Sequence, residues 1–284
     1  MASRLFRASA HAPAQADLDG FRRAQRLSYE CATTMKARLA PGMTEHEVAR
    51  RMDAWLEERG VRSYFHTSLA WFGDATRFGS GERWQALPSK TRRLLEDDVV
   101  ILDTAPIVDG YVGDVGYTTS LKPNRELDLA RARLLELRAE LPALFARGLA
   151  SDAIWRAVDG KLRAWGYDNV HAAYPFSVLG HRVYRVPFPR LRLQKLPGGG
   201  WPFTLHTYFS FASRGLVGEL LGPKPAIATE GLWAIEPHLG AKGFGAKFEE
   251  ILVVESTGPG GRAYWLDDEV PHVTEKHEKH EVTS

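Results

Sequence analysis

Two carboxylates on either side of a predicted turn constrain this chain more than any other feature. The apolar β-formers at residues 99–102 predict a strand that ends at Asp103, and Asp114 follows on the returning strand. Between them, Asp109-Gly110 favours a hairpin, because Gly tolerates positive φ and Asp enters the left-handed region at low cost. Carboxylates brought together in this way repel each other or share a cation. The alternative is an exposed turn with two solvated acids.

Three residues downstream favour the shared cation. His181 follows a glycine, Glu236 stands in Ile-Glu-Pro, and Glu249 begins a final apolar strand. Four carboxylates and one imidazole form a hard ligand set that suits Mn, Fe, Co or Zn. Bringing them together without cations would cost several kcal/mol.

The set of motifs, in this order, resembles the methionine aminopeptidase/prolidase/aminopeptidase P superfamily over residues 18–256. The resemblance implies an α+β fold, the pita-bread fold, and two divalent metal ions. It implies that Asp114 and Glu249 bridge the ions. Asp103 would complete one ion, and His181 and Glu236 the other. A water or hydroxide between the ions would attack a carbonyl carbon, with Glu236 as general base.

Glu250 competes with Glu249 for the ligand role. Adjacent strand residues point to opposite faces, so only one of them can face the metals. The family register selects Glu249, and Glu250 should lie on the other face.

Two departures from the family pattern concern histidines. Superfamily peptidases usually carry a second histidine seven residues after the Gly-His ligand, where this chain has Phe188. They usually carry another in the loop before the first metal strand, and residues 73–84 contain none. These histidines are thought to bind the scissile carbonyl. The candidates to replace them are His66, His206, His238, Tyr184 and Tyr208.

The stretch after His181 is rich in arginine, and Arg182 and Arg185 lie nearest to that ligand. Guanidinium groups pair with carboxylates in bidentate fashion, so these arginines, with Tyr184 and Tyr208, are candidate substrate-binding residues. Three glycines at 198–200 would let the segment hinge as a lid. The alternative is a surface insertion with solvated arginines.

An internal repeat predicts two related halves. When Gly42 is aligned with Gly148, an offset of 106, Gly60 falls on Gly166, and the apolar residues Met43, Val48, Met52 and Leu56 fall on apolar residues. The pattern indicates two pseudo-symmetric helix-pair and strand halves around a curved antiparallel sheet, with a site between them.

Composition sets the remaining expectations. A net charge of +2 gives no case for nucleic acid, and no apolar run is long enough to span a membrane. Cys31 is the single cysteine, which favours a reducing compartment such as the cytoplasm. We expect a flexible N-terminus over residues 1–16, one catalytic domain over residues 17–266 and a charged, solvated tail over residues 267–284. A homodimer is expected from the family resemblance.

Three functions follow as hypotheses. The first is a dinuclear metallohydrolase that cleaves an amide, at an N-terminal or X-Pro bond of a short peptide. The second is a lyase or oxidative metalloenzyme acting on a small amino-acid-like carboxylate, which the missing histidines favour. The third is a catalytically dead binding protein, which the retention of the ligands disfavours.

Overall fold

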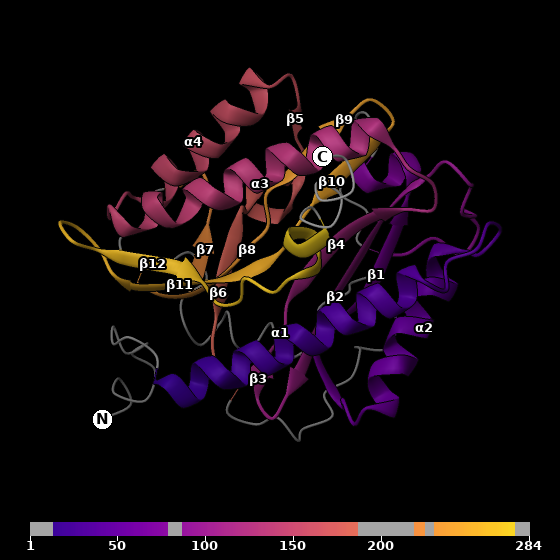
Figure 1. The fold of residues 1–284 in the computed structure, drawn as a ribbon, viewed down its shortest axis with the longest axis horizontal. Helices are drawn as coiled ribbons and strands as arrows, with labels where there is room; N and C mark the ends of the chain where they lie inside the picture. Colours follow the sequence, from indigo (N-terminus) through magenta and orange to yellow (C-terminus); the bar gives the residue numbers. More distant parts are fainter. Residues whose placement is uncertain (1–13, 79–86, 187–218, 225–229, 276–284) are drawn as a thin grey trace, which may run out of the picture.

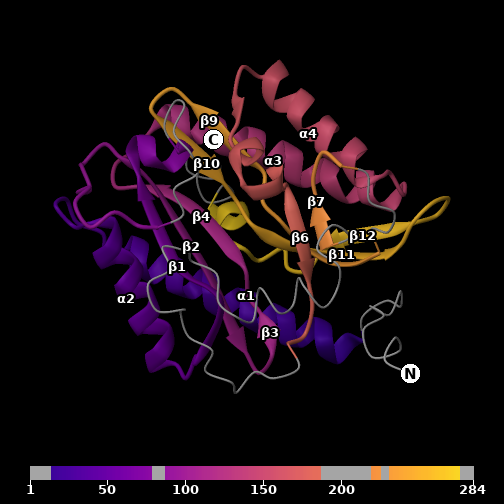
Figure 2. The ribbon, with the colours of Figure 1, turned by 180° about the vertical axis from the view of Figure 1, so that it is seen from behind.

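The computed structural model describes residues 14–78, 87–186, 219–224 and 230–275 of the 284-residue chain. Two helix pairs frame this part of the molecule. The first pair is α1 (Gln15–Lys36) and α2 (Glu45–Glu58), and the second is α3 (Arg125–Ala146) and α4 (Ser151–Ala164). In Figure 1 the first pair lies along the lower side and the second along the upper side, with the strands between them. The view from behind shows the same arrangement (Figure 2).

The predicted repeat is confirmed by the helix bounds. An offset of 106 places both ends of α2 on the corresponding ends of α4, and α1 and α3 each have 22 residues. The glycines that frame α2 and α4 all adopt positive φ: 90° at Gly42, 89° at Gly60, 71° at Gly148 and 81° at Gly166. Because non-glycine residues rarely adopt such angles, glycines mark the corresponding helix boundaries in both halves.

The sheet of the first half is built on β2 (Val99–Val108), which pairs antiparallel with three strands. These partners are β1 (Ser63–Phe72), β3 (Tyr111–Val112) and β4 (Val115–Ser120). The expectation that this strand ends at Asp103 is wrong, because β2 continues for five further residues. It ends where Asp109 and Gly110 take φ of 52° and 92°, as the predicted hairpin requires.

The second half contributes a five-stranded sheet in the order β12-β11-β8-β6-β7 and a three-stranded sheet in the order β10-β9-β5. The bounds of these strands are β5 (Asp168–Asn169), β6 (Gly180–Val183), β7 (Leu220–Leu221), β8 (Gly231–Ile235), β9 (His238–Ala241), β10 (Phe244–Lys247), β11 (Glu250–Ser256) and β12 (Arg262–Trp265). A β-bridge between Tyr117 and Phe248 joins the halves. Short 3-10 helices occupy Gly73–Arg77, His171–Ala173 and Pro175–Ser177.

Each helix pair buries its apolar stripe against the strands. Met52 and Leu56 of α2 belong to one core cluster with Phe72 of β1, and Leu134 of α3 belongs to another with Trp233 of β8. α2 starts at a capping box in which the Thr44 hydroxyl accepts from the backbone amide of residue 47 and that glutamate accepts from the Thr44 amide. No helix among the described residues is long and apolar enough to cross a membrane.

Residues 267–275 pack against the body of the protein. Val270 is buried, His272 stacks on Phe248 with ring centroids 5.3 Å apart, and Glu275 accepts hydrogen bonds from Lys36 and Tyr117. The expectation that solvent surrounds the chain from residue 267 is therefore wrong for this segment. Its charged residues find partners on α1 and β4, which composition alone does not reveal. Residues 276–284 lie outside the described chain, and the division into domains stays a prediction.

Candidate metal centre

The hairpin brings Asp103 and Asp114 together in the interior. Asp103 of β2 pairs with Gly116 of β4, and Asp114 directly precedes β4. Both carboxylates are almost fully buried, with exposures of 3% and 1%. The alternative of an exposed turn with solvated acids is wrong.

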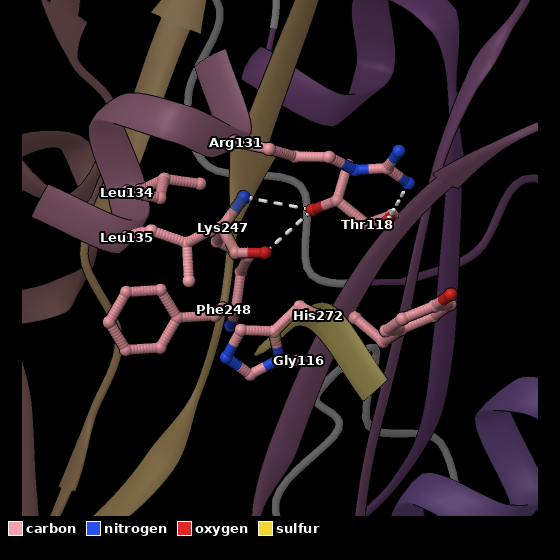
Figure 3. Close-up of a pocket in the computed structure, with 9 residues that line it drawn as sticks. Gly116, Thr118, Arg131, Leu134, Leu135, Lys247, Phe248 and His272 are labelled. Atoms are coloured by element: carbon pink, nitrogen blue, oxygen red, sulfur yellow. Dashed lines mark hydrogen bonds between the residues drawn. The ribbon is translucent and has the colours of Figure 1, made fainter. Parts of the chain in front are cut away.

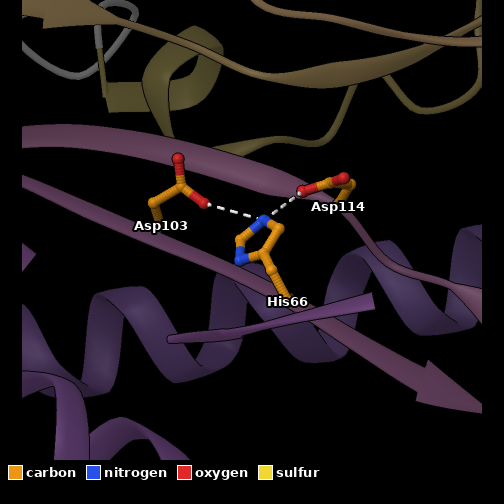
Figure 4. Close-up of side chains that lie close together, drawn as sticks. All are labelled: His66, Asp103 and Asp114. Carbon is orange, nitrogen blue, oxygen red and sulfur yellow. Dashed lines mark hydrogen bonds and ion pairs between the residues drawn. The ribbon is translucent and has the colours of Figure 1, made fainter. Parts of the chain in front are cut away.

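His66 of β1 lies between these two carboxylates (Figure 4). Its Nε2 is 3.2 Å from Asp114 Oδ1 and 3.3 Å from Asp103 Oδ1. Its Nδ1 lies 2.9 Å from the carbonyl oxygen of Thr67. A carbonyl only accepts, so Nδ1 carries the hydrogen and Nε2 is the atom that meets the acids.

His181 of β6 approaches Asp114 from the other side. Its Nε2 is 3.1 Å from Asp114 Oδ2, and its Nδ1 is 3.1 Å from the carbonyl oxygen of Arg182. The two oxygens of Asp114 therefore face two different imidazoles, each fixed in the same tautomer by a backbone carbonyl. Such second contacts orient metal-binding histidines.

The remaining carboxylates meet a lysine that sequence reasoning missed. Lys247 Nζ donates to Asp103 Oδ2 at 2.7 Å, to Glu236 Oε2 at 2.8 Å and to Glu249 Oε2 at 2.9 Å. A signal for it existed, because residues two apart in an extended segment share a face, and Lys247 is two residues before Glu249. The cluster thus contains a lysine ammonium beside its four acids.

Hydrogen bonds between Thr118 and the backbone of Lys247, and the absence of a side chain at Gly116, hold Lys247 in place. Thr118 Oγ accepts from the Lys247 amide at 2.9 Å and donates to its carbonyl oxygen at 2.6 Å. A Cβ at Gly116 would lie 2.3 Å from Lys247 Cε, so the space for the lysine stem exists only because residue 116 is glycine. The ring of Tyr174 lies 5.9 Å from the ammonium.

Burial and mutual charge shift the pKa values throughout the cluster. Burial raises the pKa of Glu249, and the charges of Asp114 and Glu236 raise it further. Burial also raises the pKa of Glu236, and Lys247 only partly offsets this. Burial lowers the pKa of His66, but the charge and hydrogen bond of Asp114 outweigh it and raise the value to about 9. Burial raises the pKa of Asp114, yet the two histidines lower it overall.

These donors fit divalent metal ions. Two groups have ligand atoms within 4.8 Å of one another: Asp114 with His181 and Glu249, and Asp114 with His66 and Asp103. Asp103 Oδ1 is buried and receives no hydrogen bond within the described chain. Carboxylate oxygens and imidazole nitrogens that converge in a buried site are ligands that suit a divalent cation.

Glu250 lies on the opposite face from the cluster, as predicted. It accepts from Arg138 Nε at 2.7 Å and Nη2 at 2.8 Å, and from His272 Nε2 at 2.6 Å. Glu249 alone of the two glutamates therefore faces the other acids.

The remaining candidate residues lie in three kinds of place. Arg182 lies on the face of β6 opposite to His181, with its guanidinium 4.7 Å from the centre of the Trp233 ring. Arg185 lies over Tyr111 at the hairpin, 5.1 Å from the ring centre, and Tyr184 is half-buried beside it. His238 is bonded to Tyr174 through Nδ1 at 2.8 Å. Arg182, Arg185 and His238 therefore lie outside the carboxylate cluster. His206, Tyr208, Phe188 and the glycines at 198–200 lie outside the described residues.

A hollow lies beside β4 and β10, between α3 and the C-terminal segment (Figure 3). Arg131, Leu134, Phe248 and His272 line it, and the Arg131 guanidinium donates to the Thr118 carbonyl oxygen at 2.8 Å. Gly116 and Lys247 also line this hollow, but none of the four clustered carboxylates does, so the candidate metal ligands do not face it.

Fold and candidate site together define a protein of the pita-bread fold class, with candidate metal ligands contributed by both halves. Comparison with known proteins gives the family. Residues 19–256 match the model of metallopeptidase family M24, and the chain belongs to that family. The family resemblance and the fold class are confirmed at this level.

Relatives and solved structures agree with this assignment. A methionine aminopeptidase from Archaeoglobus fulgidus is 29% identical over 135 residues, which are 47% of this chain and 43% of the relative. Dipeptidase PepE from Mycobacterium ulcerans superposes with a TM-score of 0.64 at 19% identity, over 96% of this chain and 63% of that one. X-Pro aminopeptidase from Thermotoga maritima gives 0.63 at 15% identity, over 90% and 62%. The chain thus spans less than two thirds of the length of these proteins, and their structures support the fold.

Proposed function

We propose that this protein hydrolyses an amide bond at or near the amino terminus of a short peptide, with two divalent metal ions held around Asp114. The observation that carries the proposal is the arrangement at Asp114, whose two oxygens each face an imidazole Nε2, at 3.2 Å and 3.1 Å. That arrangement suits a carboxylate that bridges two cations. Divalent ions bound there would polarise the scissile carbonyl and lower the pKa of a water towards 7.

The side chains of the cluster supply the remaining chemistry. Glu236 is the general base: burial raises the pKa of its carboxyl, which suits it to take a proton from the attacking water. Lys247 fixes the carboxylates of Glu236 and Glu249 through one oxygen of each, and it holds a positive charge beside the reacting centre. The packed interior excludes bulk water, which strengthens each of these interactions.

A few finer features belong to the same proposal. Arg185 and Tyr184 follow His181 in the sequence, and in this proposal they bind the carboxylate end of a short substrate. We propose Mn, Fe, Co or Zn as the metal, a homodimer as the assembly and the cytoplasm as the location. Nucleic acid and membranes are not proposed as partners.

Activity on a peptide library tests the proposal. Metal-depleted protein should release amino-terminal residues from short peptides, X-Pro peptides among them, after reloading with one of the four metals. Asp114→Asn should abolish release, and Asp97→Asn, at a carboxylate that is 90% exposed, should not. If no peptide is cleaved with any metal while the ions bind, the amide hydrolase is refuted. A metalloenzyme for a small amino-acid-like carboxylate then takes its place.

A further inference from the structure

Lys247 is hydrogen-bonded to three carboxylates that the family resemblance assigns as metal ligands. Its ammonium takes one oxygen each from Asp103, Glu236 and Glu249. Its side chain is only 2% exposed, and Gly116 and Thr118 hold its stem and backbone. These oxygens are therefore engaged in the arrangement that the structure describes, and an ion near Asp103 needs a different donor.

His66 lies where such a donor is needed. Its Nε2 is directed at Asp103 Oδ1, the oxygen that Lys247 does not bind, and at Asp114 Oδ1 (Figure 4). Because Thr67 accepts the hydrogen of Nδ1, a neutral His66 presents a lone pair to two acids. A lone pair facing carboxylate oxygens is unfavourable unless a proton or a metal ion lies between them.

The separations match those of atoms that share an ion. Two donors bound at about 2.1 Å lie about 3.0 Å apart at a right angle and about 3.4 Å apart at a tetrahedral angle. The Nε2 of His66 is 3.2 Å and 3.3 Å from its two oxygens, and that of His181 is 3.1 Å from its oxygen. The two imidazoles thus stand in equivalent positions on the two sides of Asp114.

We propose that His66 is a metal ligand: it holds one ion with Asp103 and Asp114, while His181 and Glu249 hold the other with Asp114. His66 thereby replaces the donor oxygens that Lys247 occupies. The chain uses two histidines where the family resemblance implies one. This inference rests on the metal centre of the proposed function.

Zinc content measures the role of His66 directly. Wild-type protein, equilibrated with excess zinc and dialysed, should retain two ions per chain by mass spectrometry of the metal. His66→Gln should retain one ion fewer. His46→Gln, which removes a half-exposed imidazole on α2, should match the wild type. If His66→Gln retains the two ions of the wild type, the inference is wrong and the proposed function stands. If the wild type binds one ion or none, both fail.

X-ray absorption at the zinc edge tests the ligand without any variant, so it stands even if His66→Gln does not fold. The two-zinc wild type should show on average one imidazole for each zinc. An average of one imidazole for every two zinc ions would overturn the assignment of His66.

Discussion

Glu249 and Glu250 are neighbours in sequence, yet the structure gives them separate tasks that one pair of substitutions can distinguish. Glu250 is fully buried and accepts two hydrogen bonds from Arg138, at 2.7 Å and 2.8 Å, and one from His272. Glu250→Gln leaves a guanidinium whose side chain is 10% exposed without its carboxylate. Breaking a buried ion pair costs about 3–5 kcal/mol.

The expected loss lies near the lower bound of that range. Arg138 keeps the carbonyl oxygen of Asp267 at 3.0 Å and the carboxylate of Asp268 at 3.2 Å. We therefore expect a loss of about 3 kcal/mol, which for a chain of this size lowers Tm by roughly 6–12 °C. Urea unfolding with an unchanged m value is the assay, and the metal content should stay at the wild-type level.

Glu249→Gln is the matched variant and should behave in the opposite way. Burial and neighbouring acids raise the pKa of Glu249, so a neutral side chain there costs the metal-free protein little stability. Its metal content should fall. The reasoning is refuted if Glu250→Gln unfolds within about 1 kcal/mol of the wild type or loses metal, because the two faces of the segment would then not be separate.

Three further predictions test other parts of the structure. Gly116→Ala places a Cβ 2.3 Å from Lys247 Cε. We expect the free energy of unfolding in urea to fall by about 1–3 kcal/mol and peptide cleavage to be strongly reduced. An unchanged free energy of unfolding and unchanged cleavage would show that Lys247 is not held as described. In metal-free protein, the raised pKa of His66 stabilises the fold. This stabilisation is fully present below the unfolded pKa of about 6.5 and is lost as pH rises through about 9. An unfolding free energy that does not change with pH over this window would contradict the contact with Asp114. Thr44→Ala removes the cap of α2 and should cost about 1 kcal/mol, whereas Thr91→Ala, in an exposed loop, should cost less.

Local sequence signals predicted those parts of the fold that depend on local chemistry. Asp109-Gly110 specified the hairpin because few other residues accept two successive positive φ angles. Gly42 and Gly148 located the repeat, because a helix of the same length, α2 or α4, begins three residues after each of them. The period of two along an extended segment separated Glu249 from Glu250.

Contacts between distant segments could not be predicted in the same way. Nothing near His66 in sequence shows that β1 brings it to Asp114, because the pairing of β1 with β2 includes register shifts on both sides of His66. Residues 267–275 looked like a solvated tail until Glu275 was found bonded to Lys36 and Tyr117. Lys247 differs from these cases, because its distance of two residues from Glu249 already places it on the same face as that carboxylate.

The metal content of Asp114→Asn shows whether Asp114 holds the metal centre together. Asp114 is the residue shared by both groups of candidate ligands, so its replacement should remove ions from both positions. We expect wild type and Asp97→Asn to retain divalent metal after dialysis, and Asp114→Asn to retain almost none while its unfolding transition stays cooperative. A folded Asp114→Asn protein with the metal content of the wild type would show that the metal centre lies elsewhere.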